Sequence, residues 1–172
     1  MQDLSKEKCL HVMMDILSVL KSTNKHEEVF SRIIDRITRL YRCESCAFIL
    51  IDPKTEYLKI ESSHGISHTF QKSFRRQIST GAIGGLLWNG KPIVIADSST
   101  EQQLADEIQL EQPFGSCVCV PVSADHRSLG YLYVACTRTL CLQPDDVHLL
   151  QACADLAGIA YYKCRLAEEN MH

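Results

Sequence analysis

The chain has 172 residues, a mass of 19.4 kDa and a formal net charge of −3. Hydrophobic residues make up 45% of it and charged residues 23%, which excludes a disordered chain, a collagen and a coiled-coil rod and fits one globular domain. This acidic balance also argues against nonspecific binding to nucleic acid or to a membrane surface. No apolar run approaches the roughly 18 residues of a membrane span, and the N-terminus lacks the pattern of a signal peptide, so we expect a cytoplasmic protein.

The N-terminal third predicts two helices and a strand hairpin. Apolar residues at alternating three- and four-residue spacing predict a helix over 3–22, and a one-sided apolar pattern predicts a second over 26–42. The run CAFILI at 46–51 is typical of a strand covered on both faces. After a turn, the alternation at 56–61 predicts a half-exposed strand at a sheet edge.

Residues 62–80 are irregular, with a short helix that bears Phe70 and Phe74. Further along, we expect a short helix at 83–89, a strand at 92–96 and a helix at 101–110 whose start is capped by oxygens of residues 97–100. A second hairpin joins strands 116–122 and 130–136, and a long helix runs from Pro144 to about Asn170. Antiparallel hairpins with segregated helices predict an α+β domain with one central sheet.

Nine cysteines, an odd number, lie mostly inside apolar runs and are expected to be buried, reduced and inert. Cys43 with Cys46 and Cys117 with Cys119 have spacings found in thiolate metal sites, but apolar strand residues flank them, so no metal site is assigned. Cys43 and Cys46, at a helix-to-strand junction, are the better candidates for redox or metal chemistry.

No catalytic motif stands out. The segment GLLWNGKP at 85–92 approaches a phosphate-binding loop, but Pro92 replaces the hydroxyl residue and removes an N–H, so a short helix closed by glycine is the favoured interpretation. We find no acid–base pair and no cofactor motif, and the carboxylates follow a solvated-surface pattern.

Three blocks in order resemble one known family: STGAIGGLLWNGKPIVIADSS (79–99), GSCVCVPVSADHRSLGYLYVAC (115–136) and LQPDDVHLLQACADLAGIAYYKCRL (142–166). They are similar to the central block, the terminal hairpin and the closing helix of GAF domains, which are PAS-related sensor modules for small molecules or redox state. The resemblance covers about residues 24–169, which leaves 1–23 as an N-terminal helix for dimerisation or linkage.

The resemblance implies a central antiparallel sheet with the terminal helices packed on one face and a ligand pocket on the other. It also implies dimers built through the terminal helices, in bacterial signalling proteins whose output is a histidine kinase, a cyclase or a transcriptional activator; no output domain is present in this chain. The signatures of cyclic-nucleotide and bilin-binding members are absent, so the ligand stays unidentified.

The expected function is therefore a non-catalytic sensor of a small molecule. Two alternatives stay open: a small redox enzyme that reduces free methionine sulfoxide with Cys117 or Cys119, and a pure dimerisation module. For the homodimer we expect residues 3–22 and 145–168 to pair, through an apolar seam on each helix. The seam residues are Leu10, Met13, Leu17 and Leu20 on the first helix and Leu149, Cys153, Leu156 and Ala160 on the last.

The expected pocket lies between the sheet and residues 64–110. Aromatic walls with a few polar groups are typical of small-ligand sites. Arg75 and Arg76 are candidate partners for an anionic ligand. The predicted lining residues are Phe70, Phe74, Trp88, Phe114 and Ser116.

Overall fold

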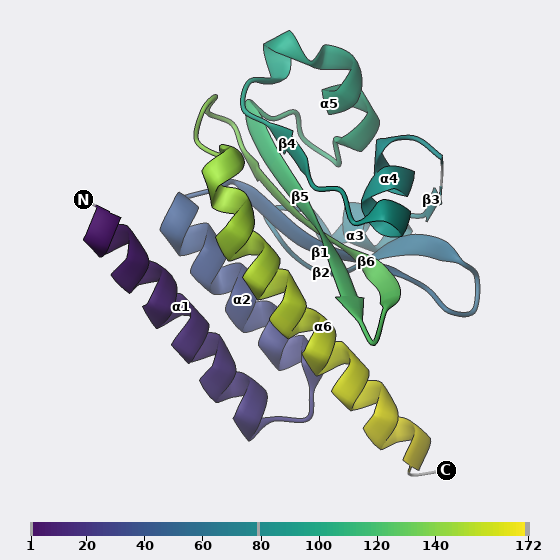
Figure 1. The fold of residues 1–172 in the computed structure, drawn as a ribbon. Helices are drawn as coiled ribbons and strands as arrows, with labels where there is room; N and C mark the ends of the chain where they lie inside the picture. The colour runs from purple at the N-terminus through teal and green to yellow at the C-terminus, as the bar shows by residue number, and fades with distance from the viewer. Residues whose placement is uncertain (1, 79, 171–172) are drawn as a thin grey trace.

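The computed structural model describes residues 2–78 and 80–170; Met1, Ser79 and residues 171–172 lie outside the described part. Its centre is a six-stranded antiparallel sheet in the order β3-β2-β1-β6-β5-β4, with helices on both faces (Figure 1). The strands are β1 (Ser45–Ile51), β2 (Tyr57–His64), β3 (Arg76–Gln77), β4 (Ile93–Ile95), β5 (Ser116–Ala124) and β6 (Arg127–Cys136). The predicted α+β class with an antiparallel sheet is confirmed.

The terminal helices cover one face of the sheet (Figure 1). Helices α2 (His26–Tyr41) and α6 (Val147–Asn170) pack on the strands, and α1 (Gln2–Ser22) packs against both of these helices. Helix α2 forms because its apolar residues recur at helical spacing, and it buries Val29, Phe30, Ile33, Ile34 and Ile37. The 3₁₀ turn η2 (Pro144–Asp146) leads into α6 through a reciprocal capping box between Gln143 and Asp146.

Shorter elements cover the other face: α3 (His68–Ser73), α4 (Ala82–Asn89), the 3₁₀ turn η1 (Ser98–Thr100) and α5 (Gln102–Ile108). Because side chains alternate across a strand, the sheet separates two cores. On β1, for example, Phe48 and Leu50 face the terminal helices, whereas Ala47 and Ile49 face the short elements.

Three local predictions need correction. Strand β2 is longer than predicted, and β3 pairs with its first two residues, so β2 is an edge strand over only part of its length. The Asp97 side chain accepts a hydrogen bond from Ser99 N and so caps η1; α5 begins at Gln102 without a side-chain cap. Phe74 follows α3 instead of lying on it.

The predicted seam on the last helix is also largely wrong as a contact surface. Cys153, Leu156 and Ala160 are buried within the chain itself, because α6 uses this face to pack on β5 and α2. The large apolar side chains that α6 leaves exposed are Ile159 and Leu166. Within the described residues, no helix combines the length and the hydropathy that a membrane crossing requires.

Candidate functional site

Two buried tyrosines lie on β6, on the sheet face beneath the short helices. Tyr131 and Tyr133 are two residues apart, so both side chains point to the same face. Both are fully buried, and neither hydroxyl has a hydrogen-bond partner among the described residues. Burial is the largest cause that raises the pKa of each hydroxyl, so both stay protonated and are available as donors.

Arg76 of β3 is the third polar group on this face. Its Nη2 atom donates to the Gln109 carbonyl at 3.4 Å, and its guanidinium lies 5.5 Å from the centroid of the Phe74 ring. Its Nη1 atom is buried without a partner among the described residues. The charge of Arg76 and a side-chain contact between its guanidinium and the Tyr131 hydroxyl oxygen both oppose the rise in the pKa of Tyr131, so the two groups lie side by side.

Arg76, Tyr131 and Tyr133 together form what we term the polar cluster. Buried hydrogen-bonding groups in folded proteins nearly always have partners, and leaving one unpaired costs about 1–3 kcal/mol. Even where the Arg76 guanidinium approaches the Tyr131 oxygen, the two tyrosine O–H groups have no acceptor among the described residues, which is a costly arrangement for the ligand-free chain. Chemically, the cluster presents one cationic and two neutral donors, which suits a ligand with several acceptor oxygens and negative charge.

Three of the five predicted lining residues border this core. Phe114 is buried and meets Tyr133 edge to face, with ring centroids 6.3 Å apart. Phe74 is buried beneath Arg76, and half-buried Phe70 lies 5.8 Å from the Phe74 ring. The segment from α3 to β5 thus supplies an aromatic surround for the polar cluster.

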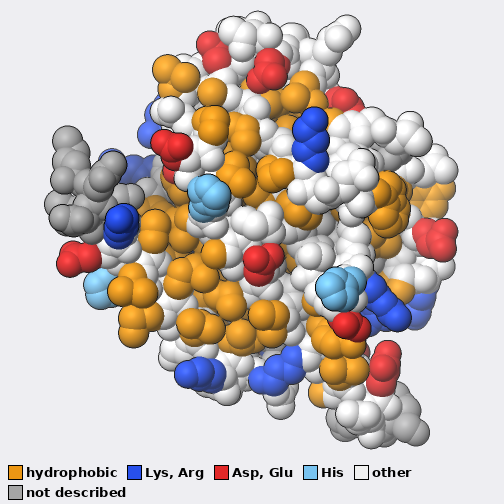
Figure 2. Space-filling view, viewed as in Figure 1, with side chains coloured by type: hydrophobic (Ala, Val, Ile, Leu, Met, Phe, Trp, Pro, Cys, Tyr) orange, Lys and Arg blue, Asp and Glu red, His pale blue; other side chains and the backbone are white. Residues whose placement is uncertain are grey.

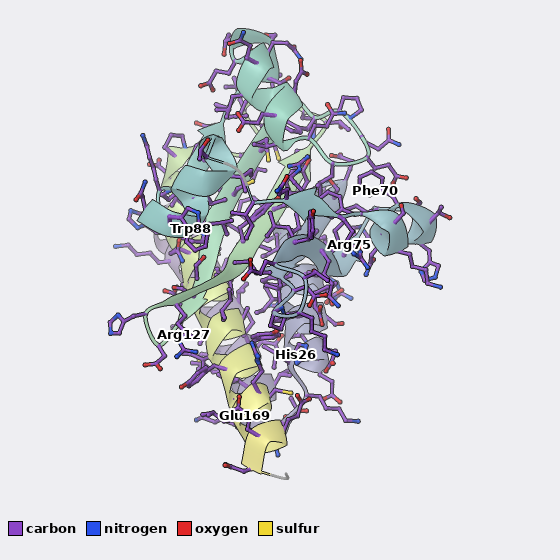
Figure 3. All side chains as sticks on the ribbon, turned by 90° about the vertical axis from the view of Figure 1, so that its right-hand side faces the viewer. His26, Phe70, Arg75, Trp88, Arg127 and Glu169 are labelled. Atoms are coloured by element: carbon purple, nitrogen blue, oxygen red, sulfur yellow. The ribbon has the colours of Figure 1, made fainter. Side chains whose placement is uncertain are left out.

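The other two predicted residues lie elsewhere. Trp88 is 62% exposed on the outside of α4, well separated from Phe70 of α3 (Figure 3). The Ser116 hydroxyl donates to the Arg138 carbonyl at 2.8 Å and accepts from Leu142 N at 3.2 Å. Ser116 therefore anchors the loop that follows β6. Arg75 is exposed and donates to the carbonyls of Lys72 and Phe74, whereas Arg76 turns inward.

A separate open cavity of about 540 Å³ lies among α4, β4 and α5 and includes none of the five predicted lining residues. Its polar lining comes from Asn89 and Lys91, and its apolar lining includes Pro92, Ile93 and Leu104. The predicted position between the sheet and residues 64–110 therefore holds two distinct features, this cavity and the polar cluster.

The two central cysteines also belong to this face. Cys117 and Cys119 are fully buried beside Tyr133, with their sulfur atoms 3.9 Å apart, as the strand alternation predicts. Burial raises the pKa of the Cys117 thiol well above its usual value, which disfavours the nucleophilic thiolate. The other predicted pair, Cys43 and Cys46, is buried in the opposite core, and burial raises the pKa of Cys43 to about 12.

Among the described residues, one group of three side chains has the spacing to hold a metal ion: His26, Glu27 and Glu61. It contains no cysteine and lies on the side of the terminal helices.

Comparison with known proteins identifies the fold. The sequence profile of the GAF domain matches residues 25–161. The chain belongs to the GAF domain family. The match begins just before α2 and ends within α6, so all six strands of this GAF domain lie inside it.

Solved structures agree with this assignment at low sequence identity. The GAF domain of an Acinetobacter phosphoenolpyruvate-protein phosphotransferase superposes with a TM-score of 0.79 at 14% identity, covering 91% of this chain and 94% of that one. Free methionine-R-sulfoxide reductase from Neisseria meningitidis, solved with its substrate, superposes with a TM-score of 0.78 at 18% identity. The match covers 92% of this chain and 91% of that one. A domain of a sensor histidine kinase from Sinorhizobium meliloti 1021 superposes with a TM-score of 0.64 at 14% identity. The match covers 87% of this chain and 99% of that one. Among curated protein sequences, none matches this GAF domain significantly.

Sequence reasoning missed Tyr131 and Tyr133. The signal was present in GYLYV, because two tyrosines at strand spacing in an apolar run share one face. The sequence pattern does not show that the short helices cover the face on which these two tyrosines lie.

Proposed function

We propose that this GAF domain is a non-catalytic regulatory module that binds a small organic anion at the polar cluster. This proposal rests on the observation that Arg76, Tyr131 and Tyr133 place three donor groups with incomplete hydrogen bonding in one region. A carboxylate or a similar group pairs with a guanidinium and accepts from two hydroxyls at once, which would remove the cost of leaving them unpaired. The phenyl rings of Phe74 and Phe114 supply the apolar walls.

The route from ligand to output runs through β6. Tyr131 and Tyr133 belong to the polar cluster, while the residues between and beyond them, Leu132 and Val134, face the terminal helices. After β6, the chain runs through residues 137–143 and η2 into α6. A ligand that shifts or stiffens β6 would therefore act on the surface on which α2 and α6 pack. A domain of a two-component sensor histidine kinase with a similar fold supports a regulatory role.

The terminal helices also supply the dimer contact in this proposal. Helix α1 buries Val12 and Ile16 against α2 and α6, yet its outer face exposes three apolar side chains, with Leu10 at 60%, Met14 at 59% and Leu17 partly exposed. Their spacing of four and three residues puts them on one stripe. Hydrophobic side chains gather over the helical layer along the strip that α1 occupies (Figure 2). A second copy offers the same stripe, so a two-fold contact would cover both.

The ligand site is tested with tyrosine-to-phenylalanine variants. Tyr131→Phe and Tyr133→Phe remove an unpaired buried hydroxyl, so the ligand-free protein should keep its melting temperature or gain stability. Native mass spectrometry identifies any co-purified molecule, and a thermal-shift panel of small carboxylates provides the probes. Stabilisation by a carboxylate should be lost or strongly reduced in both variants and in Arg76→Gln.

Trp88→Ala is the matched control, because it removes an aromatic side chain of the same segment that lies outside the polar cluster. It should leave both melting temperature and ligand stabilisation unchanged. If Tyr131→Phe and Tyr133→Phe lower stability and no carboxylate shifts the melting of the wild type, the hydroxyls are structural and the ligand proposal is wrong. That outcome would favour a pure dimerisation module.

The dimer is tested separately by sedimentation velocity. A Met14→Lys or Leu10→Lys change should convert a micromolar dimer into a monomer, because it buries a charge in the proposed contact. Leu140→Lys, at another large exposed apolar residue, is the control and should leave the dimer intact. A wild type that sediments as a monomer contradicts this part of the proposal.

A second candidate function rests on the thiols of Cys117 and Cys119, which lie 3.9 Å apart on the same face as the polar cluster. A free methionine sulfoxide reductase has a similar fold. Reduction would need a thiolate, which burial disfavours at Cys117. An assay with free methionine sulfoxide and a thiol reductant separates the two candidates, since turnover that Cys117→Ser or Cys119→Ser abolishes would establish the enzyme.

A further inference from the structure

Cys136 and Cys141 bring their sulfur atoms within 2.9 Å of each other, and both are free thiols. Cys136 is the last residue of β6, and Cys141 lies in the loop that leads to η2 and α6. This separation is shorter than the 3.9 Å between Cys117 and Cys119. Forming a disulfide at about 2.05 Å would need a sulfur movement of about one ångström.

The two thiols differ in access. Cys136 is fully buried in the core beneath the terminal helices, whereas Cys141 is only half-buried. Burial, followed by the hydrogen bond from Cys141, raises the pKa of the Cys136 thiol. An oxidant therefore reaches Cys141 first, and Cys136 lies in position to resolve the product.

The loop that carries Cys141 is held firmly at several points. Ser116 binds it at Arg138 O and Leu142 N, and Arg138 donates to the carbonyls of Tyr41 and Arg42 at 3.0 and 2.8 Å. The Tyr41 carbonyl lies 3.5 Å from the Cys141 sulfur and is a second acceptor within reach of its single S–H. These contacts keep the two sulfur atoms together instead of leaving the encounter to loop motion.

We propose that Cys136 and Cys141 form a reversible disulfide when the protein meets hydrogen peroxide. The Cys141 thiolate attacks one peroxide oxygen, the O–O bond breaks, and a sulfenic acid and water result after proton transfer. The Cys136 sulfur then attacks the Cys141 sulfur, the S–O bond breaks, and a second water leaves with the Cys136 proton. The two thiols lose two electrons in total, and the peroxide gains them.

Other pairings are less favourable. Cys117 and Cys119 are fully buried and lie two residues apart on one strand, where side chains stand side by side instead of pointing at each other. Cys43 faces the same core region as Cys136, but it is buried and burial raises its pKa to about 12. Cys136 with Cys141 is thus the pair that combines proximity with access.

The bond would act on the helix that leaves the domain. It would remove the Cys141 S–H that lies within reach of the Tyr41 carbonyl and tie the end of β6 to the loop three residues before Pro144, where η2 begins. Oxidation should therefore slow amide exchange in residues 137–143 and at the start of α6. This device is independent of whether the polar cluster binds a ligand.

The experiment uses the full chain, treated with hydrogen peroxide, alkylated and digested with trypsin without reduction. Arg127, Arg138 and Lys163 place Cys136 in peptide 128–138 and Cys141 in peptide 139–163. The expected product is a cross-link between these two peptides, located at Cys141 by fragmentation because Cys153 shares its peptide. Dithiothreitol should reverse it and restore the exchange rates.

Cys141→Ser should lose the cross-link completely, and Cys153→Ser should retain it. Wild-type protein labelled with a heavy and a light alkylating reagent before and after reduction gives the same assignment without any variant. A cross-link from peptide 43–54, a bond between two chains, or oxidation of Cys141 to a sulfinic acid without a cross-link would each overturn the proposal.

Discussion

The His26 imidazole at the start of α2 lies 3.2 Å from the Glu61 carboxylate of β2, measured from Nε2 to Oε1. The same ring meets Tyr161 of α6 edge to face, with centroids 5.0 Å apart. His26 therefore joins three elements that are distant in sequence, on the side of the molecule where α6 passes α2 (Figure 3). A cavity of about 250 Å³ opens at this junction.

The charges around His26 are mostly negative. Burial lowers the pKa of the imidazole, but the hydrogen bond to Glu61 and the charges of Glu27, Glu61 and Glu168 outweigh it, so the pKa is raised above 6.5. The same hydrogen bond is the largest cause that lowers the pKa of Glu61 below 4.5. Other titratable or charged groups lining this junction are Asp52 and Lys59 near β2 and Tyr161, Cys164 and Arg165 on α6.

The first prediction is a pH window for stability. A raised His26 pKa adds stability that is present below pH 6.5 and lost as pH rises through the folded value. A lowered Glu61 pKa adds stability that is present above pH 4.5 and lost as pH falls through its folded value. The contribution of this pair to the unfolding free energy should therefore be largest between these two pKa values and decline on either side.

Urea unfolding of wild type and His26→Gln across this range measures the effect. The decline as pH rises above 6.5 should disappear in His26→Gln and persist in His148→Gln, which changes an exposed histidine of α6. Identical pH profiles for wild type and His26→Gln would show that the pair is not coupled to folding.

The second prediction concerns two glycines within helices. At Gly158 of α6, an added Cβ would overlap the carbonyl oxygen of Ser123 on β5, so the helix would have to move away from the sheet. At Gly85 of α4, an added Cβ has no neighbour within 4 Å. We expect Gly158→Ala to lower the unfolding free energy by about 1–3 kcal/mol, and Gly85→Ala to raise it by about 0.5–1 kcal/mol. Thermal denaturation of both variants checks the contrast, and a neutral Gly158→Ala would contradict the close packing of α6.

The third prediction separates an anchor from a ligand contact. Ser116→Ala removes the acceptor of the buried Leu142 N–H and the donor to Arg138 O, and should lower the unfolding free energy by about 1–3 kcal/mol. Stabilisation by a carboxylate should not change. Ser73→Ala, at an exposed helical serine, serves as the control and should have little effect. Loss of ligand response in Ser116→Ala without loss of stability would assign Ser116 to the site.

The fourth prediction is a count of reactive thiols. The expectation that most cysteines are buried is confirmed, and the three with partial exposure are Cys9, Cys141 and Cys164. Native protein should show three thiols that react quickly with Ellman's reagent and six that react only on unfolding. Peroxide treatment should reduce the fast count to two. Cys43, a sequence-based candidate for a reactive thiol, should be among the slow ones; its rapid labelling would contradict the structure.

Much of the fold could be predicted because its signals are local. Helix α2 and strands β1, β5 and β6 follow from apolar spacing over a few residues, and three blocks in order indicated the GAF family before any contact was known. Strand β3 has only two residues and could not be found this way, since its pairing with β2 depends on the chain around it.

The site was only partly predictable, because convergence of side chains depends on sheet order and register. Periodicity puts Tyr131 and Tyr133 on one face of a strand, but only the order β3-β2-β1-β6 brings Arg76 of a distant edge strand to the same face. The packing of α4 leaves Trp88 exposed, and the path of the loop after β6, held by Ser116, brings Cys141 against Cys136. Interactions within a few residues are enough to indicate the longer helices and strands and the family to which they belong. Which buried groups meet was decided by the tertiary structure, because those contacts join segments that only the folded sheet places side by side.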